Sequence, residues 1–431
     1  MSSPAALFTD RYELTMLQAA LRSGAAHRRC TFEVFARRLP AGRRYGVVAG
    51  TGRLLDELTD FRFGDAELAV LARDSVVDAE TLRWLEGFRF TGNIWGYAEG
   101  DVYLPDSPVL TVEGSFAEAV LLETLVLSVL NHDSAVAAAA ARMVGAAAGR
   151  PCLEMGSRRT HEEAAVAAAR AAYLVGFAGT SNLAAGARYG VPTIGTAAHA
   201  FTLLHDSEEA AFAAQVASLG RSTTLLVDTY DVALGVETAV KVAGPELGAV
   251  RLDSGDLLEQ AQAVRAQLDA LGNPATKIVV TSDLDEFAIA ALAAAPVDSY
   301  GVGTSLVTGS GAPTAGMVYK LVEREDASGE LRPVAKRSDG KVGHGGRKGA
   351  WRRHDESGAA VEELLAVGPF EPRGTDRPLQ GPLVEGGSVL ERPTLAESRA
   401  RHETAVAALP ASARQLSRGE PAIPTTFLPE G

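Results

Sequence analysis

Residues 151–201 hold a basic turn and a histidine, and both are of types that can do chemistry. An apolar run ends in residues 156–159, Gly-Ser-Arg-Arg, and the planar guanidinium groups of arginine suit phosphate and carboxylate. His199 follows Thr196 in the sequence Gly-Thr-Ala-Ala-His-Ala-Phe. A lone histidine after a strand is more often structural than catalytic, but its small neighbours here do not need an imidazole for packing. We therefore expect His199 to act as a nucleophile or as a general acid or base.

Aspartates that follow apolar runs form a second group of candidates. One or two such residues would be routine helix caps, and several here are expected to be caps. Six converging carboxylates exceed what capping needs. They fit a Mg²⁺-dependent reaction on a polyphosphate, because hard cations take oxygen ligands and often bind through substrate phosphates and water. They are equally suited to stabilising a developing positive charge or to bonding ribose hydroxyls. The six are Asp228, Asp231, Asp253, Asp256, Asp283 and Asp285.

A glycine turn, Gly-Val-Gly-Thr-Ser at residues 301–305, follows another apolar run. Backbone N–H groups and a hydroxyl can hold a phosphate in such a turn. Alone this motif is weak, and its place beside the other polar strand ends strengthens it. The sequence shows no Ser-His-Asp order, Walker loop, Gly-x-Gly-x-x-Gly element or His-Glu-x-x-His helix, which removes most kinase, dehydrogenase, hydrolase and zinc-protease functions.

A series of strand–turn–helix units must position these candidates. Apolar runs enter polar turns at residues 225–231, 250–256, 278–285 and 300–307. The run before residue 156 and a predicted strand over residues 191–195 bring the units to six. Continuous apolar strands are typical of a sheet buried on both faces. The pattern predicts an α/β barrel whose carboxyl-end loops form one site, with a doubly wound open sheet as the alternative.

The two ends of the sequence predict a second domain. Residues 1–115 mix amphipathic helices with short strands, which favours an open antiparallel sheet with helices on one side. The basic, glycine-rich residues 335–353 predict a mobile loop followed by a strand, and the later segment predicts a layer that completes the N-terminal sheet. We therefore expect an N-terminal sandwich part over residues 1–115, a barrel over 116–335, and a C-terminal sandwich segment and tail over 336–431.

The composition excludes several classes of protein. A net charge of −13 argues against non-specific binding to nucleic acid or to an anionic membrane, although local arginines still allow anionic substrates. Cys30 and Cys152 are the only cysteines, too few for a disulfide framework or a thiolate metal site. No leader sequence opens the chain, and no apolar run approaches the ~18 residues of a membrane span. These features predict a cytoplasmic protein.

Seven segments, taken together, resemble nicotinate phosphoribosyltransferases over roughly residues 5–355. In order they are TDRYELTM, EMGSRRTHEEA, FAGTSNLAAG, VPTIGTAAHAF, VRLDSGDL, SDLDE and VGTSLVTGSGAPTAGMVYKL. The resemblance implies a type II phosphoribosyltransferase fold, an irregular α/β barrel plus an open-faced α+β sandwich built from both chain termini. It also implies the reaction of nicotinate, 5-phosphoribosyl 1-pyrophosphate and ATP to give nicotinate mononucleotide, pyrophosphate, ADP and phosphate.

The resemblance also implies roles for individual residues. His199 looks like the histidine that ATP phosphorylates, so that the phosphohistidine drives nucleotide synthesis. Thr196 and Arg251 look like nicotinate contacts. Tyr12 is similar to a tyrosine that stacks on the nicotinate ring from the neighbouring subunit, which implies a homodimer with shared active sites.

The sugar-phosphate contacts follow in the same way. Ser157, Arg158, Gly303 and Thr304 look like contacts to the ribose phosphate or to phosphoribosyl pyrophosphate. Asp253 and Asp283 lie where the family handles the ribose and its metal-bound pyrophosphate, so that Mg²⁺ would bind mainly through that substrate. Two other functions stay open: a nicotinamide phosphoribosyltransferase, and a catalytically silent barrel that binds nucleotides or sugar phosphates.

Overall fold

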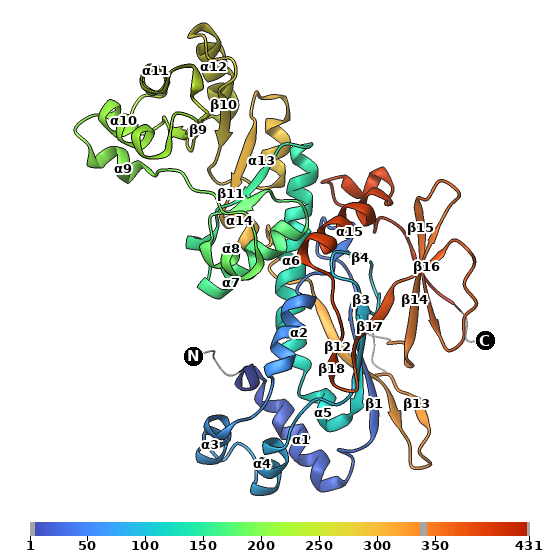
Figure 1. The fold of residues 1–431 in the computed structure, drawn as a ribbon. Helices are drawn as coiled ribbons and strands as arrows, with labels where there is room; N and C mark the ends of the chain where they lie inside the picture. Colours follow the sequence, from blue (N-terminus) through green and yellow to red (C-terminus); the bar gives the residue numbers. More distant parts are fainter. Residues whose placement is uncertain (1–4, 337–342, 429–431) are drawn as a thin grey trace. The chain divides into compact units, whose positions relative to one another are not determined.

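The computed structural model describes residues 5–336 and 343–428 (Figure 1). The chain forms two compact units, a terminal unit of Met1–Ala135 with Thr314–Gly431 and a central unit of Val136–Pro313. These units differ from the predicted boundaries, because residues 116–135 and 314–335 group with the terminal unit. One continuous helix, α6 (Glu123–Ala147), runs through the predicted start of the barrel, and β12 (Met317–Glu325) pairs with an N-terminal strand.

The terminal unit is built on a sheet whose adjacent strands are antiparallel. Its strand order is β13 (Leu331–Pro333), β12, β1 (Arg29–Ala36), β5 (Leu110–Ser115), β3 (Asn93–Tyr97), β17 (Gln380–Glu385) and β18 (Ser388–Val389). The pairing of β17 with β3 confirms that the C-terminal segment completes an N-terminal sheet.

Smaller sheets and helices complete this unit. One sheet has the order β16 (Asp376–Pro378), β14 (Lys348–His354), β15 (Ala360–Val367) and β19 (Thr425–Phe427), and β2 (Gly46–Val47) pairs with β4 (Val102–Tyr103). Strand β14 confirms the strand predicted within residues 335–353, whereas residues 337–342 of the predicted loop lie outside the described residues. The helices are α1 (Arg11–Ser23), α2 (Thr51–Asp60), α3 (Asp65–Arg73), α4 (Ala79–Glu86), α5 (Phe116–Val120) and α15 (Leu395–Ala407).

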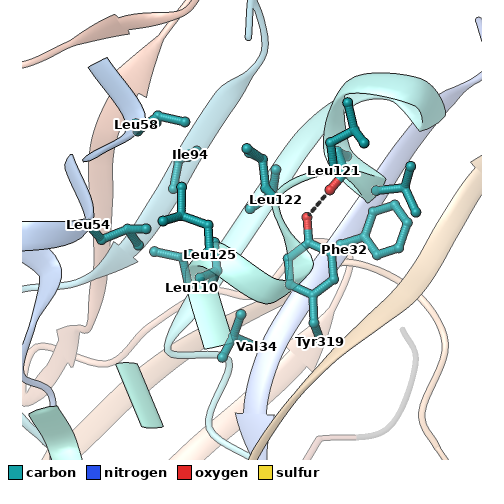
Figure 2. Close-up of a cluster of buried hydrophobic side chains, with 14 of the residues drawn as sticks. Phe32, Val34, Leu54, Leu58, Ile94, Leu110, Leu121, Leu122, Leu125 and Tyr319 are labelled. Carbon is teal, nitrogen blue, oxygen red and sulfur yellow. Dashed lines mark hydrogen bonds between the residues drawn. The ribbon is translucent and has the colours of Figure 1, made fainter. Parts of the chain in front are cut away.

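The core of the terminal unit lies between the large sheet and its helices. Figure 2 shows side chains of β1, β3 and β5 packed with leucines of α2 and α6. The rings of Phe32 and Tyr319 stack at 4.8 Å between centroids, and the buried Tyr319 hydroxyl donates to the Ala119 carbonyl at 2.8 Å. The apolar segment Phe116–Ala147 is long enough to cross a membrane, but 67% of its most apolar window is buried inside the protein. It is therefore a core element by burial.

The central unit is a six-stranded parallel sheet with helices between its strands. The strand order is β7 (Gly179–Thr180), β6 (Cys152–Glu154), β11 (Ser299–Val302), β10 (Lys277–Val280), β9 (Ala249–Leu252) and β8 (Thr224–Leu226). The helices are α7 (Glu162–Leu174), α8 (Leu183–Tyr189), α9 (His199–Leu204), α10 (Glu208–Leu219), α11 (Val232–Ala243), α12 (Leu257–Ala270), α13 (Glu286–Ala291) and α14 (Thr304–Val307). This curled half-barrel confirms the predicted α/β class (Figure 1).

One predicted strand is wrong. Residues 191–195 are irregular, and only Thr193 forms a parallel bridge, to Thr180. The strand beside β6 is instead the short β7, which the sequence did not predict. Pro192 and Gly195 flank the bridge, and both residue types are poor strand formers, so the segment pairs with the sheet edge at this one residue and forms no strand.

Candidate active site

Polar side chains gather where the strands of the central sheet end. Asp253 directly follows β9, Thr281 directly follows β10, and Asp228 lies two residues after β8. These strands are adjacent and parallel, so their carboxyl ends meet at one edge of the sheet. We refer to this side of the central sheet as the carboxyl edge.

His199 is the first residue of α9, and its imidazole lies at the carboxyl edge. The side chain is 40% exposed, its Nδ1 lies 3.1 Å from the Thr229 hydroxyl, and its Nε2 lies 3.9 Å from Asp228 Oδ1 and 3.8 Å from Asp253 Oδ2. The last two distances are too long for hydrogen bonds but bring two carboxylates close to one ring nitrogen. The imidazole is therefore accessible and lies in an acidic setting, not in packed hydrocarbon.

Asp228 is the most deeply placed of these carboxylates, with a side chain only 1% exposed. Its Oδ2 accepts the N–H of Asp253 and the hydroxyl of Ser254, each at 2.8 Å. Its Oδ1 is buried and has no hydrogen-bond partner among the described residues. Sequence reasoning found Asp228 only as one of six aspartates, since nothing local marks it as the one beside His199.

Arg251 links the ends of neighbouring strands to the loop before His199. Its Nε donates to Thr281 Oγ1 at 2.9 Å, its Nη1 to Thr196 Oγ1 at 3.2 Å, and its Nη2 to Asp253 Oδ1 at 3.0 Å. Burial alone would raise the pKa of Asp253, but hydrogen bonds from Thr281 and Arg251 outweigh it and hold that pKa below its ordinary value. The structure thus joins the predicted residues Thr196, Arg251, Asp253 and His199 in one polar cluster.

The two predicted phosphate-binding turns follow β6 and β11. Ser157 begins a 3-10 turn after β6, and Thr304 begins α14 after Gly303. The strands are paired in parallel, and Met155 N donates to the Val302 carbonyl at 2.8 Å, so the two turns start side by side. Arg158 and Thr304 are exposed at this end of the sheet.

Of the remaining aspartates, three are helix caps and one, Asp283, is not bonded to the His199 cluster in the described part of the chain. The carboxylates of Asp231, Asp256 and Asp285 accept backbone N–H groups at the starts of α11, α12 and α13, so the capping interpretation is confirmed for these three. Asp283 is exposed, and among the described residues no hydrogen bond or ion pair joins it to the His199 cluster.

Tyr12 belongs to the terminal unit, at the start of α1. The helix begins after Asp10 and is followed by Gly24, which adopts a left-handed conformation with φ of 75° and caps the helix. The Tyr12 side chain is 44% exposed, and burial together with the charge of Glu123 raises the pKa of its hydroxyl. The aromatic ring of Tyr12 is therefore accessible at the surface of the terminal unit.

Two family models match most of the chain. The model described as the nicotinate phosphoribosyltransferase (NAPRTase) N-terminal domain matches residues 7–131, and the model of the nicotinate phosphoribosyltransferase (NAPRTase) family matches residues 151–363. The chain belongs to the nicotinate phosphoribosyltransferase family. The second match spans every strand of the carboxyl edge.

Individual relatives agree with this assignment. The nicotinate phosphoribosyltransferase pncB1 of Mycobacterium tuberculosis is 60% identical over 436 residues, which cover 99% of this chain and 96% of the relative. The pncB2 enzyme of the same species is 43% identical over 424 residues, covering 95% of this chain and 89% of the relative. The crystal structure of human nicotinic acid phosphoribosyltransferase superposes with a TM-score of 0.82 at 28% identity and covers 97% of both chains.

These relatives confirm the predicted family, fold and enzyme class. The nicotinate phosphoribosyltransferase family gives the chain its activity at the coarse level, the synthesis of nicotinate mononucleotide in NAD salvage.

Proposed function

We propose that this enzyme couples ATP to nicotinate mononucleotide synthesis through a phosphohistidine at His199. The observation that carries the proposal is the exposed imidazole between Asp228 and Asp253 at the carboxyl edge. Two carboxylates beside Nε2 stabilise the positive charge that develops on the ring as the other nitrogen attacks the γ-phosphorus of ATP. A nitrogen–phosphorus bond forms, the bond from that phosphorus to the oxygen of ADP breaks, and water later releases the phosphate.

The second half of the reaction joins the pyridine to the sugar. Arg251 and Thr196 would bind the nicotinate carboxylate, since a guanidinium and a hydroxyl already meet there at 3.2 Å. The ring nitrogen attacks the anomeric carbon, its bond to that carbon forms, and the carbon–oxygen bond to pyrophosphate breaks. The ionised Asp253 stabilises the oxocarbenium-like charge on the ribose, while positioning supplies much of the rate.

The sugar phosphate would occupy the paired turns after β6 and β11. Ser157 and Arg158 on one turn, with Gly303 and Thr304 on the other, supply hydroxyl, guanidinium and backbone N–H groups at adjoining strand ends. Arg158 makes no hydrogen bond or ion pair among the described residues, so its guanidinium is open to an anion. This arrangement suits a phosphate monoester.

The acidic residues fit a magnesium ion only with help from the substrate. No group of three or more His, Cys, Asp or Glu side chains is placed to hold a metal within residues 5–336 and 343–428. Asp253 and Asp283 would hold Mg²⁺ together with phosphate oxygens and water, which is the usual mode for this cation. When bound, the ion neutralises the charge of the leaving pyrophosphate. The buried, unpartnered Asp228 Oδ1 adds negative potential beside this position.

The exposed ring of Tyr12 supports a homodimer with shared active sites. Leu7, Phe8 and Tyr12, which are close in the sequence, are 36%, 63% and 44% exposed. Large exposed apolar side chains of this kind favour a protein partner. We propose that the partner is a second copy of the chain and that Tyr12 stacks on nicotinate in that copy.

Replacing His199 with alanine tests the coupling. We expect ADP formation to be lost and slow, ATP-independent synthesis of nicotinate mononucleotide to remain. His161→Ala is the matched control, because His161 is 71% exposed at the start of α7 and should leave both rates unchanged. Full stimulation by ATP in the His199 variant would refute the phosphohistidine.

A product assay with each pyridine tests the substrate. Nicotinate and nicotinamide are supplied separately with phosphoribosyl pyrophosphate, with and without ATP. We expect nicotinate to be preferred, because Arg251 offers a cation to its carboxylate. A faster reaction with nicotinamide would overturn this part of the proposal.

A further inference from the structure

The buried carboxylate of Glu154 joins the ends of two strands in the central sheet. Glu154 is the last residue of β6 and is 0% exposed. Its Oε1 accepts the N–H of Gly156, where the Ser157–Arg158 turn begins, and its Oε2 accepts the hydroxyl of Thr180, the last residue of β7. Glu154 and Thr180 also face each other in the parallel register of the two strands.

Asn182 closes this pair of contacts into a ring. The Thr180 oxygen accepts the N–H of Asn182 at 2.9 Å, and Asn182 Nδ2 donates to the Ser157 hydroxyl at 3.0 Å. The Asn182 Oδ1 accepts the N–H of Ala185 at 2.9 Å and so caps α8. Hydrogen bonds that start at Glu154 therefore return, through Thr180 and Asn182, to the turn that follows Glu154. Asn182 is itself fixed because it caps α8.

The same turn packs closely on the next strand end. A Cβ added to Gly156 would lie 2.3 Å from Val307 Cγ1 and 3.0 Å from the Gly303 carbonyl oxygen, so only glycine fits. The turn after β6 is thereby held against the turn after β11. Both turns that offer groups to a phosphate form one assembly, and Glu154 lies at its base.

Stability alone does not account for a carboxylate at this position. Among the described residues no Arg, Lys or His pairs with Glu154, and burial raises the pKa of its carboxyl group, against which the Thr180 and Gly156 hydrogen bonds act. An uncompensated buried carboxylate costs free energy that an apolar side chain of similar size would not. What the carboxylate supplies is two acceptors aimed at two different strand ends.

We propose that Glu154 is the positioning residue of the phosphate-binding turn. Acting through Thr180 and Asn182, it fixes the backbone of residues 156–158 and the Ser157 hydroxyl, and so directs Arg158 toward the phosphate of the phosphoribosyl substrate. This inference rests on the proposed function, which assigns Ser157 and Arg158 to that substrate. Glu154 itself touches no substrate.

Three variants test the ring. Glu154→Gln retains shape but replaces one of the two acceptor oxygens with an amide N–H₂, so either the Gly156 N–H or the Thr180 hydroxyl loses its acceptor. Thr180→Val removes the hydroxyl, and Thr180→Ser keeps it as the matched control. We expect the first two to raise KM for phosphoribosyl pyrophosphate about tenfold or more, with kcat and the KM for nicotinate within about threefold. The serine variant should resemble the unmodified enzyme.

A double variant and a binding measurement complete the test. Glu154→Gln combined with Thr180→Val should be no worse than the worse single variant, because both break one ring. An unchanged KM for phosphoribosyl pyrophosphate in both single variants would overturn the inference. So would a fall in kcat together with a rise in both KM values that tracks a lower melting temperature, since that pattern marks a merely structural role.

Calorimetric binding of phosphoribosyl pyrophosphate without nicotinate separates this inference from the proposed function. If the unmodified chain binds the compound but makes no nicotinate mononucleotide, and the variants bind it more weakly, the positioning role stands and the proposed function fails. If the unmodified chain makes product and the variants bind as tightly as it does, only the positioning role fails.

Discussion

Buried carboxylates are held in different ways in two regions of the molecule. In the terminal unit, carboxylates beside β14 and β15 meet buried cations: Lys348 Nζ lies 2.7 Å from Glu33, and Arg352 lies 2.8 Å from Asp101 and 2.7 Å from Glu363. At the carboxyl edge of the central sheet, Glu154 and Asp228 accept hydrogen bonds only from backbone N–H groups and hydroxyls of the described residues.

The difference separates charges that serve the fold from charges that serve a ligand. A buried carboxylate with its own arginine or lysine is neutralised whether or not a ligand is bound. A carboxylate without a cation of its own is available for another role: Asp228 lies beside the His199 imidazole, and Glu154 holds two strand ends through their hydrogen-bond donors. Removing a cation from the pairs beside β14 and β15 should therefore destabilise the terminal unit. Removing a carboxylate at the carboxyl edge should instead lower the activity.

The largest expected effect is on the stability of the terminal unit, where Arg352 pairs with Asp101 and Glu363. Replacing Arg352 with methionine should lower the free energy of unfolding of the terminal unit by about 3–5 kcal/mol, because Asp101 and Glu363 would stay buried without their cation. The three tryptophans, Trp84, Trp95 and Trp351, all belong to this unit, so urea unfolding followed by their fluorescence reports on it.

The control for Arg352 is Arg377→Met. Arg377 contacts Asp101 at 2.8 Å, but its side chain is 44% exposed, so its loss should cost under about 1 kcal/mol. An equal loss of unfolding free energy in Arg352→Met and Arg377→Met would show that burial does not determine how much each arginine stabilises the protein.

The carboxyl edge should respond in activity instead. Asp228→Asn removes one of the two carboxylates beside His199 Nε2 at unchanged size, and we expect ATP-coupled synthesis to fall about 100-fold with little change in unfolding. Asp231→Asn is the matched control, because Asp231 caps α11 and asparagine caps as well as aspartate. The measurement is the initial rates of ADP release and of nicotinate mononucleotide formation, and unaltered rates for Asp228→Asn would contradict the assigned role of the charge.

Glu13 tests the comparison inside the terminal unit, because it is buried there and is held by Thr9 and Thr124 with no cation among the described residues. Burial raises the pKa of Glu13 from 4.5 to about 7. The folded state therefore keeps a proton that the unfolded state has lost between these values. Its contribution to stability is complete below pH 4.5 and is lost as the pH rises through 7, with a slope of up to about 1.4 kcal/mol per pH unit.

A difference between two proteins measures this slope. The buried His402 acts in the opposite direction, because burial lowers its pKa from 6.5 to about 4 and stability falls as the pH drops across that range. Glu13→Gln should remove the Glu13 component alone, so the stability of the unmodified enzyme minus that of the variant should decline from pH 5 to pH 7. A difference independent of pH would show that Glu13 ionises normally.

The smallest expected effect is at an exposed pair of the central unit. Lys241 and Glu209 lie 2.8 Å apart with side chains 67% and 53% exposed. Lys241→Gln should change stability by less than about 0.5 kcal/mol, and salt should abolish even that difference. Thermal unfolding followed by circular dichroism is the measurement, and a loss above about 1 kcal/mol would mean that exposure is a poor guide to pairing strength here.

The carboxyl edge was largely predictable because its signal is local. An apolar run followed at once by a polar residue marks both a strand and its end, and this pattern gave β8, β9, β10 and β11 with Arg251, Asp253 and Thr304 in place. The same pattern could not sort the aspartates, because a cap such as Asp256 and an edge residue such as Asp253 both fall in the short turn between β9 and α12. Only the fold distinguishes them.

The buried ion pairs of Lys348 and Arg352 were not predictable, because most of their partners lie far away in the sequence. Residues 335–353 are basic and glycine-rich, a composition typical of an exposed loop, yet Lys348 and Arg352 are buried. Their partners come from residues 33, 101 and 363. No pattern within a short window indicates that Glu33 and Asp101, about 250 or more positions away, will pair with these two cations.

The pairing of β17 with β3 also constrains how the chain can acquire its structure during translation. Residues 93–97 leave the ribosome long before residues 380–385, and at about 5–20 residues per second this strand waits tens of seconds for its neighbour. The central unit is one uninterrupted segment and can finish folding in that interval. The outer edge of β3 therefore stays unpaired during synthesis until β17 emerges, and an unpaired strand edge is open to pairing with other chains.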